Sequence, residues 1–504
     1  MRPLLSPEEM ARADDAAISG GTPVEVLMER AGRATARAAI RVSGSRYGKR
    51  AAVVCGKGNN GGDGFTAARV LSGEGLGVVC MAVADPREAT GAPAEHLRRL
   101  RAAGLRVEDF DAARLRAADV VVDAIFGTGF TGKAEGLPAE AIDAINECGA
   151  PVVAVDVPSG VNGGTGAVEG PAVRAEVTVA MAAEKLGTAL PPGALRAGAV
   201  EVADIGIRVT GARTFMAGQR DVAAVLPARA MDAHKRSSGA VALLAGRRGM
   251  TGAAILAARG AVRMGAGYAT VGGTAEVDAA VASVLPEVLS EVVTDSDVLG
   301  PEALASFSQT LERAAALALG PGLGRGEGQR ALVEEALAKV DLPVVVDADG
   351  LNVLARHTSA LEDRAGETVI TPHPAELARL LDVTTGDVLT DRLGSARTAA
   401  ERFDCVVVLK GYRTVTAAPD GTAVVNPTGG PELATAGTGD VLTGAIAALL
   451  AAGLEPFVAA WASVFVHGIA GGVAASETGD VGALAMDVAE SLPEARSLVL
   501  APLP

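Results

Sequence analysis

The stretch AAVVCGKGNNGGDG (51–64) decides the fold of the first half of the chain. Its first five residues are an apolar run typical of a strand covered on both faces, and the Gly-rich turn after it leads into an Ala/Arg helix. Gly56, Gly58 and Gly61 satisfy the GxGxxG spacing in this strand–turn–helix context. A strand followed directly by a helix predicts a βα unit of a parallel sheet.

The NNGGDG core of this stretch (59–64) predicts a ligand pocket. A dinucleotide fingerprint also needs an acid roughly 20 residues later, and Asp85 comes later than that. The core instead puts two amides and a carboxylate on a loop where glycine lets the backbone approach a ligand. We therefore expect a polar pocket rather than a phosphate cradle alone. The alternative is a tight turn in which Asp63 only caps the helix.

Similar apolar runs, each followed by a turn and a helix, recur along the chain. In the first half we expect strands at 51–55, 78–83, 120–124, 152–157 and 177–182. In the second half we expect them at 240–246, 316–320, 343–349, 368–371, 405–411 and 413–418. The alternation predicts an α/β fold with parallel sheets, present twice. Residues 209–239 lose this rhythm, so we place a boundary near Gly218 and expect domains at 1–218 and 222–504.

Composition limits the function classes. With 49% hydrophobic and 21% charged residues, the 504-residue chain is not disordered. Lys and Arg total 45 against 60 Asp and Glu, and the net charge of −15 repels nucleic acid and anionic lipid, so we expect neither as a partner. The longest apolar stretch that we identify, 441–454, is interrupted by Thr443 and Gly444 and is too short to span a membrane. The N-terminus has no apolar signal region, so we expect a cytoplasmic protein.

Two further strands of the first half end in an acid before a Gly-rich loop: VVVDAIFGTGFTGK (120–133) and VVAVDVPSGVN (152–162). The carboxyl ends of parallel strands line the ligand crevice of an open sheet, so Asp123, Asp156 and Ser159 should converge there with Asn60. Amide, carboxylate, hydroxyl and carbonyl oxygens suit a hard cation. The alternative is that both acids only cap their loops.

The second half carries its strongest signal in ELATAGTGDVLTGAIAALL (432–450). Gly437 and Gly439 flank a turn into an Ala/Leu helix, whose free N–H groups and dipole make an anion hole suited to a phosphate. Asp440 stands at the helix start, where the dipole favours its ionised form and where it can accept a proton from an attacking hydroxyl. The alternative is an aspartate that only caps the helix.

The segments LMERAG (27–32), GKGNNGGDG (56–64), VVDAIFGTGFTGK (121–133) and VDVPSGVN (155–162) resemble the NAD(P)H-hydrate epimerases, over about residues 1–213. The resemblance implies a Rossmann-like three-layer αβα domain with potassium bound by Asn60, Asp123 and Ser159. It also implies that the following residues contact the hydrated dinucleotide: Asn59, Asn60, Gly61, Gly62, Asp63, Gly127, Thr128, Gly129, Phe130, Thr131, Gly132, Lys133 and Asp156. Of these, we expect Asp156 and Lys133 to transfer protons at the hydrated ring.

The second half, from about Val222 onward, resembles the ADP- or ATP-dependent NAD(P)H-hydrate dehydratases of the ribokinase-like superfamily. The resemblance is carried by 234–271, GPGLGRGEG (320–328), DADGLN (347–352), TPHPAEL (371–377), VVLKG (407–411) and 432–450. It implies a ribokinase-like αβα domain that binds Mg²⁺ with ADP or ATP. It implies hydrate contacts from Ala253, Gly322, His373 and Asp440, and nucleotide contacts from Lys410, Gly411, Tyr412, Arg413, Thr414 and Gly439. Arg247, Arg248, Gly430 and Glu432 depart from the residues usual in the family.

Together the two resemblances match the bifunctional NAD(P)H-hydrate repair enzymes. They imply that the substrates are NADHX and NADPHX, that the first domain interconverts the R and S hydrates, and that the second phosphorylates the S hydrate. Asp440 would be the base of that step, and loss of phosphate would restore NADH or NADPH. The bifunctional arrangement generally goes with ADP, and we expect a homo-oligomer.

Two alternatives stay open at this point. A ribokinase-like small-molecule kinase would leave the phosphate on its product, whereas a dehydratase releases inorganic phosphate and recovers the absorbance of reduced nicotinamide. The first half could instead be a binding module without activity, because similar folds serve as interaction scaffolds. Its NNGGDG core and strand-end acids argue for a working site.

Overall fold

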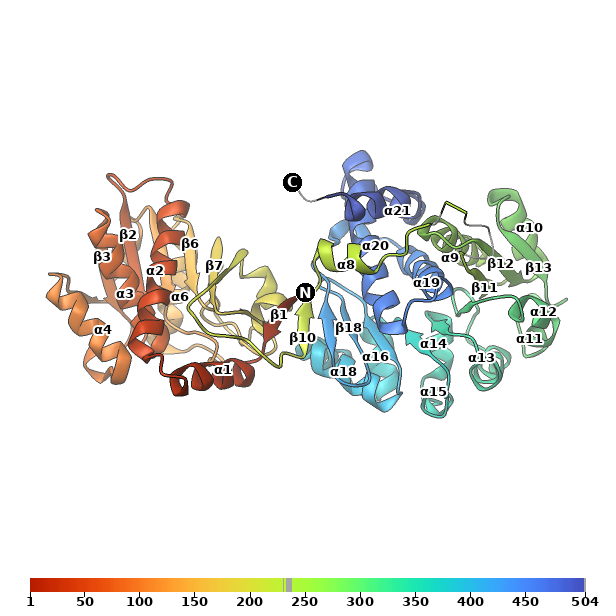
Figure 1. Ribbon diagram of the computed structural model, residues 1–504, viewed down its shortest axis with the longest axis horizontal. Helices are drawn as coiled ribbons and strands as arrows, with labels where there is room; N and C mark the ends of the chain where they lie inside the picture. Colours follow the sequence, from red (N-terminus) through yellow and green to blue (C-terminus); the bar gives the residue numbers. More distant parts are fainter. Residues whose placement is uncertain (230, 233–237, 503–504) are drawn as a thin grey trace. The chain divides into compact units, whose positions relative to one another are not determined.

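The structure, a computed structural model, describes residues 1–229, 231–232 and 238–502. The chain divides into two compact units (Figure 1). The N-terminal unit is Pro3–Thr214, and the C-terminal unit is Met1–Arg2 together with Phe215–Pro504. Residues 234–237, which begin the segment 234–271 used above, lie outside the described residues.

A parallel sheet forms the centre of the N-terminal unit. Its strands, in the spatial order β4-β3-β2-β5-β6-β7-β9, are β2 (Arg50–Cys55), β3 (Gly77–Ala82), β4 (Val107–Asp109), β5 (Val120–Ala124), β6 (Val152–Val155), β7 (Val177–Met181) and β9 (Ala199–Ala203). Each strand expected in this half is present. The chain leaves β2 first toward β4 and then returns to β5, so the strand order reverses between β2 and β5. Ligands of open α/β sheets bind at such a reversal, outside the carboxyl ends of the strands.

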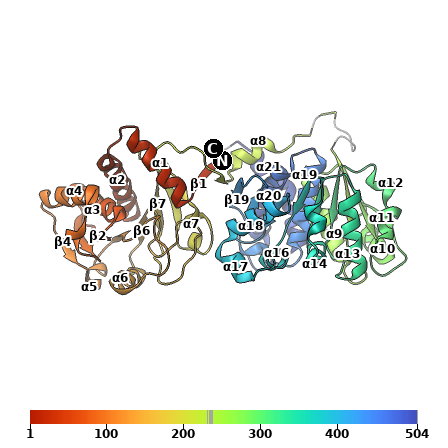
Figure 2. The same cartoon turned by 90° about the horizontal axis from the view of Figure 1, so that it is seen from below.

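Helices cover both faces of this sheet (Figure 2). They are α1 (Pro7–Ser19), α2 (Val24–Val42), α3 (Asn59–Gly73), α4 (Gly91–Ala102), α5 (Ala112–Leu115), α6 (Gly136–Glu147) and α7 (Leu186–Ala189). Successive residues of a strand point to opposite faces. Accordingly Val53 and Cys55 of β2 join the core under α2, α3 and α4, while Ala52 and Val54 join the core under α6. The expected three-layer αβα domain is confirmed.

A short parallel pair stands beside the main sheet of this unit. Leu4 and Leu5 of β1 (Arg2–Leu5) pair with β8 (Glu184–Lys185), and both residues of β8 are buried. β8 follows β7 after two residues. It therefore carries a buried lysine to within reach of the carboxyl ends of the main strands.

The sheet of the C-terminal unit runs β13-β12-β11-β14-β15-β16-β17-β18-β19, and β10 (Thr214–Met216) follows β19. These strands are β11 (Ala240–Leu244), β12 (Tyr268–Gly273), β13 (Leu289–Val292), β14 (Ala316–Leu319), β15 (Val344–Val346), β16 (Thr368–Ile370), β17 (Val406–Leu409), β18 (Val415–Ala417) and β19 (Ala423–Val425). They are parallel from β13 to β17, as expected, but β18 and β19 are antiparallel. The expectation of a purely parallel sheet is wrong here, because 410–414 is too short for the crossover that a parallel strand needs.

The helices of the C-terminal unit include four that pack together on one face of its sheet, α9, α19, α20 and α21. The helices are α8 (Gln219–Val225), α9 (Thr251–Met264), α10 (Ala275–Val284), α11 (Glu302–Ser306), α12 (Ser308–Leu311), α13 (Glu327–Lys339), α14 (Asp349–Leu354), α15 (Ser359–Glu362), α16 (Pro374–Leu381), α17 (Thr385–Thr390), α18 (Arg392–Arg402), α19 (Thr438–Ala451), α20 (Pro456–Thr478) and α21 (Ala485–Leu500). This unit also has the expected α/β architecture.

One helix, α20, is a feature that the search for apolar stretches missed. Among the described residues it alone is long and apolar enough, at 23 residues, to cross a membrane by length and composition. In this structure 72% of its most apolar window is buried inside the protein, and Trp461 and Phe465 belong to the core. A helix that is apolar on all sides can equally be the central helix of a large core.

Candidate active sites

Three of the predicted cation ligands meet at the point where the strand order of the N-terminal unit reverses. Ser159 Oγ donates to Asp123 Oδ1 at 2.6 Å, and the backbone N–H of Phe126 donates to Ser159 Oγ at 2.8 Å. Asn60 Nδ2 donates to the carbonyl oxygen of Phe126 at 2.7 Å. Asn60, Asp123 and Ser159 are all buried: the amide of Asn60 and the hydroxyl of Ser159 meet at one carbonyl, and the carboxylate of Asp123 lies beside that hydroxyl.

Asp123 is fully buried, and its partners are neutral. The N–H groups of Ile125 and Ser159 and the hydroxyl of Ser159 donate to its carboxylate. Burial raises the pKa of Asp123 to about 6, although these hydrogen bonds lower it. A buried carboxylate held only by neutral donors is a site where a bound cation would offset the cost of burying the charge.

The NNGGDG core forms the first turn of α3, which begins at Asn59, and not the loop that we expected. A Cβ on Gly61 would lie 2.0 Å from the carbonyl oxygen of Gly56, and one on Gly62 would lie 2.5 Å from Met28 Sδ. Only glycine allows this tight entry into the helix. Met28 belongs to the segment LMERAG, so the packing explains why the two segments occur together.

Asp156 follows β6 in a left-handed conformation, with φ +66°. Its Oδ2 accepts the N–H of Thr128 at 3.2 Å, and its Oδ1 forms an ion pair of 2.6 Å with Lys185 Nζ. The side-chain hydroxyl of Thr128 is buried and has no hydrogen-bond partner among the described residues. Asp156 thus links the 127–133 loop to Lys185. This lysine was not identified from the sequence.

Lys133, the other residue expected to transfer protons, lies elsewhere. Its side chain is exposed, and its methylene carbons lie against Gly170. The structure therefore pairs Asp156 with Lys185 and not with Lys133. The only sequence signal for Lys185 is a charged pair, Glu184–Lys185, directly after the apolar run at 177–182.

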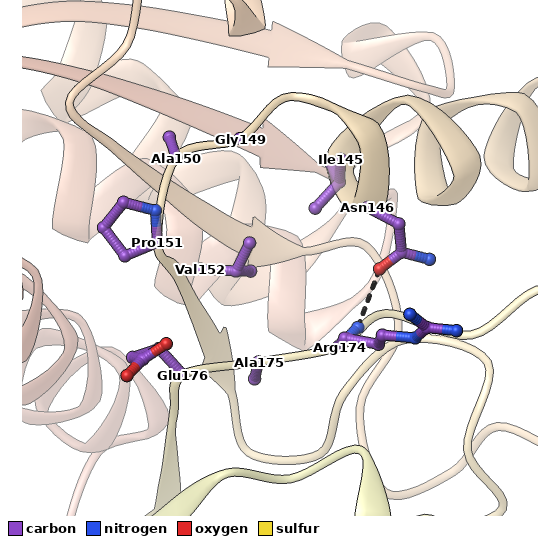
Figure 3. A pocket seen from close by; sticks show the side chains of 9 residues that line it. All are labelled: Ile145, Asn146, Gly149, Ala150, Pro151, Val152, Arg174, Ala175 and Glu176. Atoms are coloured by element: carbon purple, nitrogen blue, oxygen red, sulfur yellow. Dashed lines mark hydrogen bonds between the residues drawn. The ribbon is translucent and has the colours of Figure 1, made fainter.

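A hollow at the opposite edge of this sheet contains none of the predicted site residues (Figure 3). It lies where β6 begins and just before β7, beside the hydrogen bond from the N–H of Arg174 to Asn146 Oδ1 at 2.8 Å. The strand-end acids lie at the carboxyl edge, so this hollow is separate from the candidate site.

The candidate site of the C-terminal unit is built on an ion pair between Lys410 and Asp347. Lys410 Nζ lies 2.6 Å from Asp347 Oδ1, and Thr443 Oγ1 donates to Asp347 Oδ2 at 2.7 Å. A Cβ on Gly439 would lie 3.3 Å from Lys410 Nζ. The start of α19, the end of β17 and the end of β15 therefore meet at one point, as the strand-end arrangement predicts. Burial would lower the pKa of Lys410, but the carboxylates of Asp347 and Glu376 raise it, so the ammonium stays charged.

Asp440, on the first turn of α19, is half-buried among other acids. Burial and the charge of Asp347 raise its pKa to about 7, with Asp349 and Glu376 adding to the rise and Lys410 opposing it. We expected the helix dipole to favour the ionised form. The direction is opposite, because desolvation and neighbouring negative charge outweigh the dipole.

His373 is the N-cap of α16. Its Nδ1 accepts the N–H groups of Ala375 and Glu376 at 3.1 and 3.3 Å, so a neutral ring carries its proton on Nε2. Burial and the charges of Lys410 and Arg379 lower the pKa of His373 below its ordinary value. The cap therefore selects one tautomer. The imidazole can donate a hydrogen bond from Nε2.

The remaining predicted hydrate contacts lie on the glycine-rich loop and the helix facing it. Gly322 has φ +66°, and a Cβ there would lie 2.9 Å from the Cβ of Ala253. Arg247 lies against Gly324 of the same loop, whereas Arg248 pairs with Asp297 and Glu276. Of the two arginines that depart from the family pattern, only Arg247 thus lies against the glycine-rich loop (320–328).

Residues 410–414 form the turn between β17 and β18, and a buried arginine organises it. Arg392 of α18 donates to the carbonyl oxygens of Leu409, Lys410 and Tyr412 at 3.2–3.3 Å. Burial lowers the pKa of Arg392 to about 10, so it is still charged at neutral pH. This residue was also missed, because nothing nearby in sequence marks an arginine on a distant helix as a support for the turn.

The two other departures from the family pattern form part of the turn before α19. Glu432 is buried, and its Oε1 accepts the N–H of Gly430 at 2.7 Å. Together they close the chain into the short helix Pro431–Leu433 that precedes α19.

Comparisons with known proteins match the two parts of the chain to two families. Residues 24–187 match the profile of the family described as YjeF-related protein N-terminus, and residues 241–494 match that of NAD(P)H-hydrate dehydratase. The bifunctional NAD(P)H-hydrate repair enzyme Nnr of Moorella thermoacetica is 41% identical over 97% of this chain and 96% of its own length.

Two solved structures resemble the C-terminal unit. A ribokinase-like superfamily protein from Enterococcus faecalis has a TM-score of 0.50 and 24% identity, and the match covers 58% of this chain and 99% of that one. This likeness shows the fold. An ADP/ATP-dependent NAD(P)H-hydrate dehydratase from Bacillus subtilis, crystallised with ATP/Mg²⁺, is 31% identical over 56% of this chain and 98% of its own, with a TM-score of 0.48.

Proposed function

Because the chain belongs to the family of bifunctional NAD(P)H-hydrate repair enzymes, we propose that its two candidate sites divide the two reactions of that family. The chain is an NAD(P)H-hydrate epimerase and an NAD(P)H-hydrate dehydratase. Epimerisation takes place where Asn60, Asp123 and Asp156 lie, and dehydration where Asp347, Lys410 and Asp440 lie. The observation that carries this division is that each compact unit has its own Lys–Asp ion pair at the carboxyl edge of its own sheet.

The cation of the epimerase site is K⁺, held by Asn60, Asp123 and Ser159. One carboxylate among neutral oxygens suits a singly charged hard cation, and the buried Asp123 supplies the charge that it would neutralise. When bound, K⁺ would fix the ends of β5 and β6 and so the loops that carry the substrate contacts. Asn59–Asp63 and Gly127–Lys133 line the hydrated dinucleotide.

Epimerisation needs one proton given and one proton taken. The hydrate carries its hydroxyl on the ring carbon next to nitrogen. When that oxygen receives a proton, the C–O bond breaks, water leaves and the nitrogen lone pair forms a C=N⁺ bond. Water then adds to the other face, a new C–O bond forms, and the surplus proton passes to a base. Asp156 is that base, and Lys133 stays a proposed proton-transfer residue.

Dehydration begins with the S hydrate in the C-terminal site. Asp440 takes the proton of the ring hydroxyl as that oxygen attacks the β-phosphorus of ADP, and AMP leaves. The nitrogen lone pair then expels phosphate, and loss of a proton from the neighbouring carbon restores the double bond of NADH or NADPH. Lys410 and the N–H groups at the start of α19 bind the transferred phosphate. The Mg²⁺ that accompanies the nucleotide would offset the charge of its other oxygens.

Ala253, Gly322 and His373 line the hydrate, and the 410–414 turn with Gly439 lines the nucleotide. His373 contributes its Nε2–H, which its capping role leaves protonated and which lies 3.4 Å from Glu376 Oε1. Arg392 keeps the turn in place, so its contribution to nucleotide binding is indirect.

One assay tests the whole proposal. The purified chain is given a mixture of R and S hydrates with K⁺, Mg²⁺ and ADP, and the products are separated by chromatography. We expect both hydrates to be consumed, with NADH, AMP and inorganic phosphate formed in equal amounts. A product that keeps its phosphate would instead identify a small-molecule kinase, and consumption of the S hydrate alone would identify the N-terminal unit as a binding module.

The proposed domains, 1–218 and 222–504, are tested by separating them. Each unit has its own core, so each fragment should fold and keep its own reaction. The C-terminal fragment alone should leave the R hydrate, apart from slow spontaneous exchange, and the N-terminal fragment should restore complete repair. A parallel fragment starting at Phe215 is the control, because residues from Phe215 onward belong to the C-terminal unit.

We further propose that the enzyme works in the cytoplasm, where its reduced dinucleotides are made, and that it is a homo-oligomer. The described cysteines are all free thiols, which suits a reducing compartment. Cell fractionation tests the first statement, and light scattering of the purified chain tests the second.

A further inference from the structure

Lys185 is a buried lysine that the reaction steps above do not use. Its side chain is 1% exposed. Nζ donates to the carbonyl oxygens of Met181 and Ala183 at 2.6 and 3.0 Å, and it lies 2.6 Å from Asp156 Oδ1. An ammonium group has three N–H donors, and these partners account for all three. Lys185 therefore has no donor left for a substrate, and any effect on the reaction passes through Asp156.

The ion pair determines how Asp156 is presented. Oδ1 accepts from Met181 N at 3.2 Å in addition to pairing with Lys185, so this oxygen is turned toward the strand. Oδ2 is turned toward the 127–133 loop, where it accepts from Thr128 N. The carboxylate is 11% exposed, and the conformation of its backbone, at φ +66°, is one that L residues rarely adopt. A strained residue held by a buried cation is typical of a functional position.

Other carboxyls lie close enough to compete for the charge of Lys185. Burial and the negative charge of Asp156 raise the pKa of Asp63 well above its ordinary value. Burial raises the pKa of Asp14 on α1 to about 6, with Asp156 and Asp15 adding to the rise, and Lys185 lowers both values. Buried Glu184 is the neighbour of Lys185 in β8. Only Asp156 of these carboxyls is in direct contact with the ammonium group.

We propose that Lys185 is a positioning residue of the epimerase, which selects Asp156 from the surrounding carboxyls as the ionised base. Asp156 can then take the proton of the incoming water, while Asp63 remains the protonated neighbour. Neighbouring carboxyls whose environments separate their protonation states are how a site holds an acid and a base at one pH. The inference rests on the proposed function, because it assumes that epimerisation takes place beside Asp156.

The test compares two variants of the full chain. Lys185→Gln keeps N–H donors but removes the charge, and Lys185→Arg keeps the charge. Removing a paired charge raises the pKa of a carboxylate by about one to three units. In Lys185→Gln we therefore expect the acid limb of the epimerase kcat/KM profile to move up by about one pH unit, a roughly tenfold loss at low pH. In Lys185→Arg the limb should stay at its wild-type position, even if kcat falls.

Several controls separate this effect from a loss of structure. Lys49→Gln removes a surface lysine that pairs with Asp119 in the same unit, and it should leave the profile unchanged. Dehydration of pure S hydrate by the same chain reports on the C-terminal unit and should not change. If Lys185→Gln does not fold, carbon NMR of the aspartate carboxyls in the wild-type chain takes its place. At the pH of the epimerase assay we expect Asp63 to be protonated and Asp156 to be ionised in its ion pair with Lys185.

The outcomes distinguish this inference from the proposed function. Three results would overturn the role of Lys185: an acid limb at the wild-type position in Lys185→Gln, an equal shift of the limb in Lys185→Arg, or a protonated Asp156 in the wild-type chain at the pH of the assay. Asp156→Asn tests the site itself. If Asp156→Asn epimerises normally, the proposed function of the N-terminal site is wrong. If Asp156→Asn is inactive but the pH profile of Lys185→Gln stays at its wild-type position, only the inference about Lys185 is wrong.

Discussion

The two units contain the same ion pair in opposite orientation. In the N-terminal unit Lys185 is buried, at 1% exposed, and Asp156 is the more exposed partner at 11%. In the C-terminal unit Asp347 is buried, at 1% exposed, and Lys410 is the more exposed partner at 21%. Both pairs have a distance of 2.6 Å between Nζ and Oδ1, so the difference lies in which partner faces the crevice.

The orientation suits the ligand that each site is proposed to take. A carboxylate facing the crevice can accept a proton from water, and an ammonium facing it can bind a phosphate. In the C-terminal site the buried carboxylate of Asp347 raises the pKa of Lys410 and so keeps it charged. The same two residue types therefore give a basic site or an anion-binding site, depending on which of them the fold buries.

The largest expected effect comes from removing the carboxylate of Asp440, the proposed base of the C-terminal site. Asp440→Asn keeps the shape of the side chain but removes the base beside Lys410. Dehydration should fall by ~10²-fold or more, the usual scale for loss of a general base, while epimer exchange continues. Rates of NADH formation from pure S hydrate measure it. Asp363→Asn, at an exposed position of the same unit, is the control, and a near-normal rate in Asp440→Asn would contradict the assignment.

The pH profile tests the same residue without a mutation. Because Asp440 has a pKa of about 7 and acts when deprotonated, kcat/KM for dehydration should rise as pH passes through about 7 and then level off. The rise should be absent in Asp440→Asn. A wild-type rate that falls over this range would show that the group acts as an acid instead.

Lys410→Gln tests whether Lys410, the partner of the C-terminal ion pair that faces the crevice, binds phosphate. A charge-assisted hydrogen bond contributes about 1.5–3 kcal/mol, so we expect nucleotide binding to weaken by ~10- to 100-fold. Isothermal titration with nucleotide and Mg²⁺ measures this directly. Lys339→Gln, which removes an exposed lysine paired with Glu335, should bind normally. If Lys410→Gln also bound normally, the comparison between the two ion pairs would lose its functional meaning.

Asp123→Asn tests the proposed K⁺ site of the N-terminal unit, which lies near Asp156. The change removes the one formal charge among the proposed K⁺ ligands, so epimerisation should weaken by ~10-fold and lose its response to K⁺. Exchange of the hydrates is followed with K⁺ replaced by a bulky organic cation. Asp143→Asn on the exposed side of α6 serves as control. A K⁺ response that survives in Asp123→Asn would place the cation elsewhere.

The smallest expected effect concerns the nucleotide. If the β-phosphate of ADP lies over the start of α19, ATP overreaches by one phosphate, and ADP should give the higher turnover by a few-fold. Arg248 pairs with Asp297 and Glu276, so Arg248→Ala should change the ratio of the two rates by less than about twofold. Initial rates at saturating hydrate decide it, and a clear preference for ATP would show that the ADP assignment is wrong.

Much of the architecture follows from the sequence alone. The strands at 51–55 and 240–246 are continuous apolar runs next to Gly-rich turns, and such runs report burial on both faces wherever they occur. The strand-end position of Asp123 follows from the same pattern, and the helix-start position of Asp440 follows from the glycines before it. These features are local in sequence, which is why they could be predicted. The hairpin of β17 and β18 was missed because its strands are short and apolar, like parallel ones.

Pairing and charge were decided only by the tertiary structure. Lys410 is 63 residues from Asp347, and Lys185 meets Asp156 through a separate strand, so no spacing in the sequence identifies either pair. The raised pKa of Asp440 depends on burial and on acids contributed by other elements, which overcome the dipole that the sequence does predict. Desolvation and Coulomb interactions depend on distances in space, and these exist only once the strands have come together.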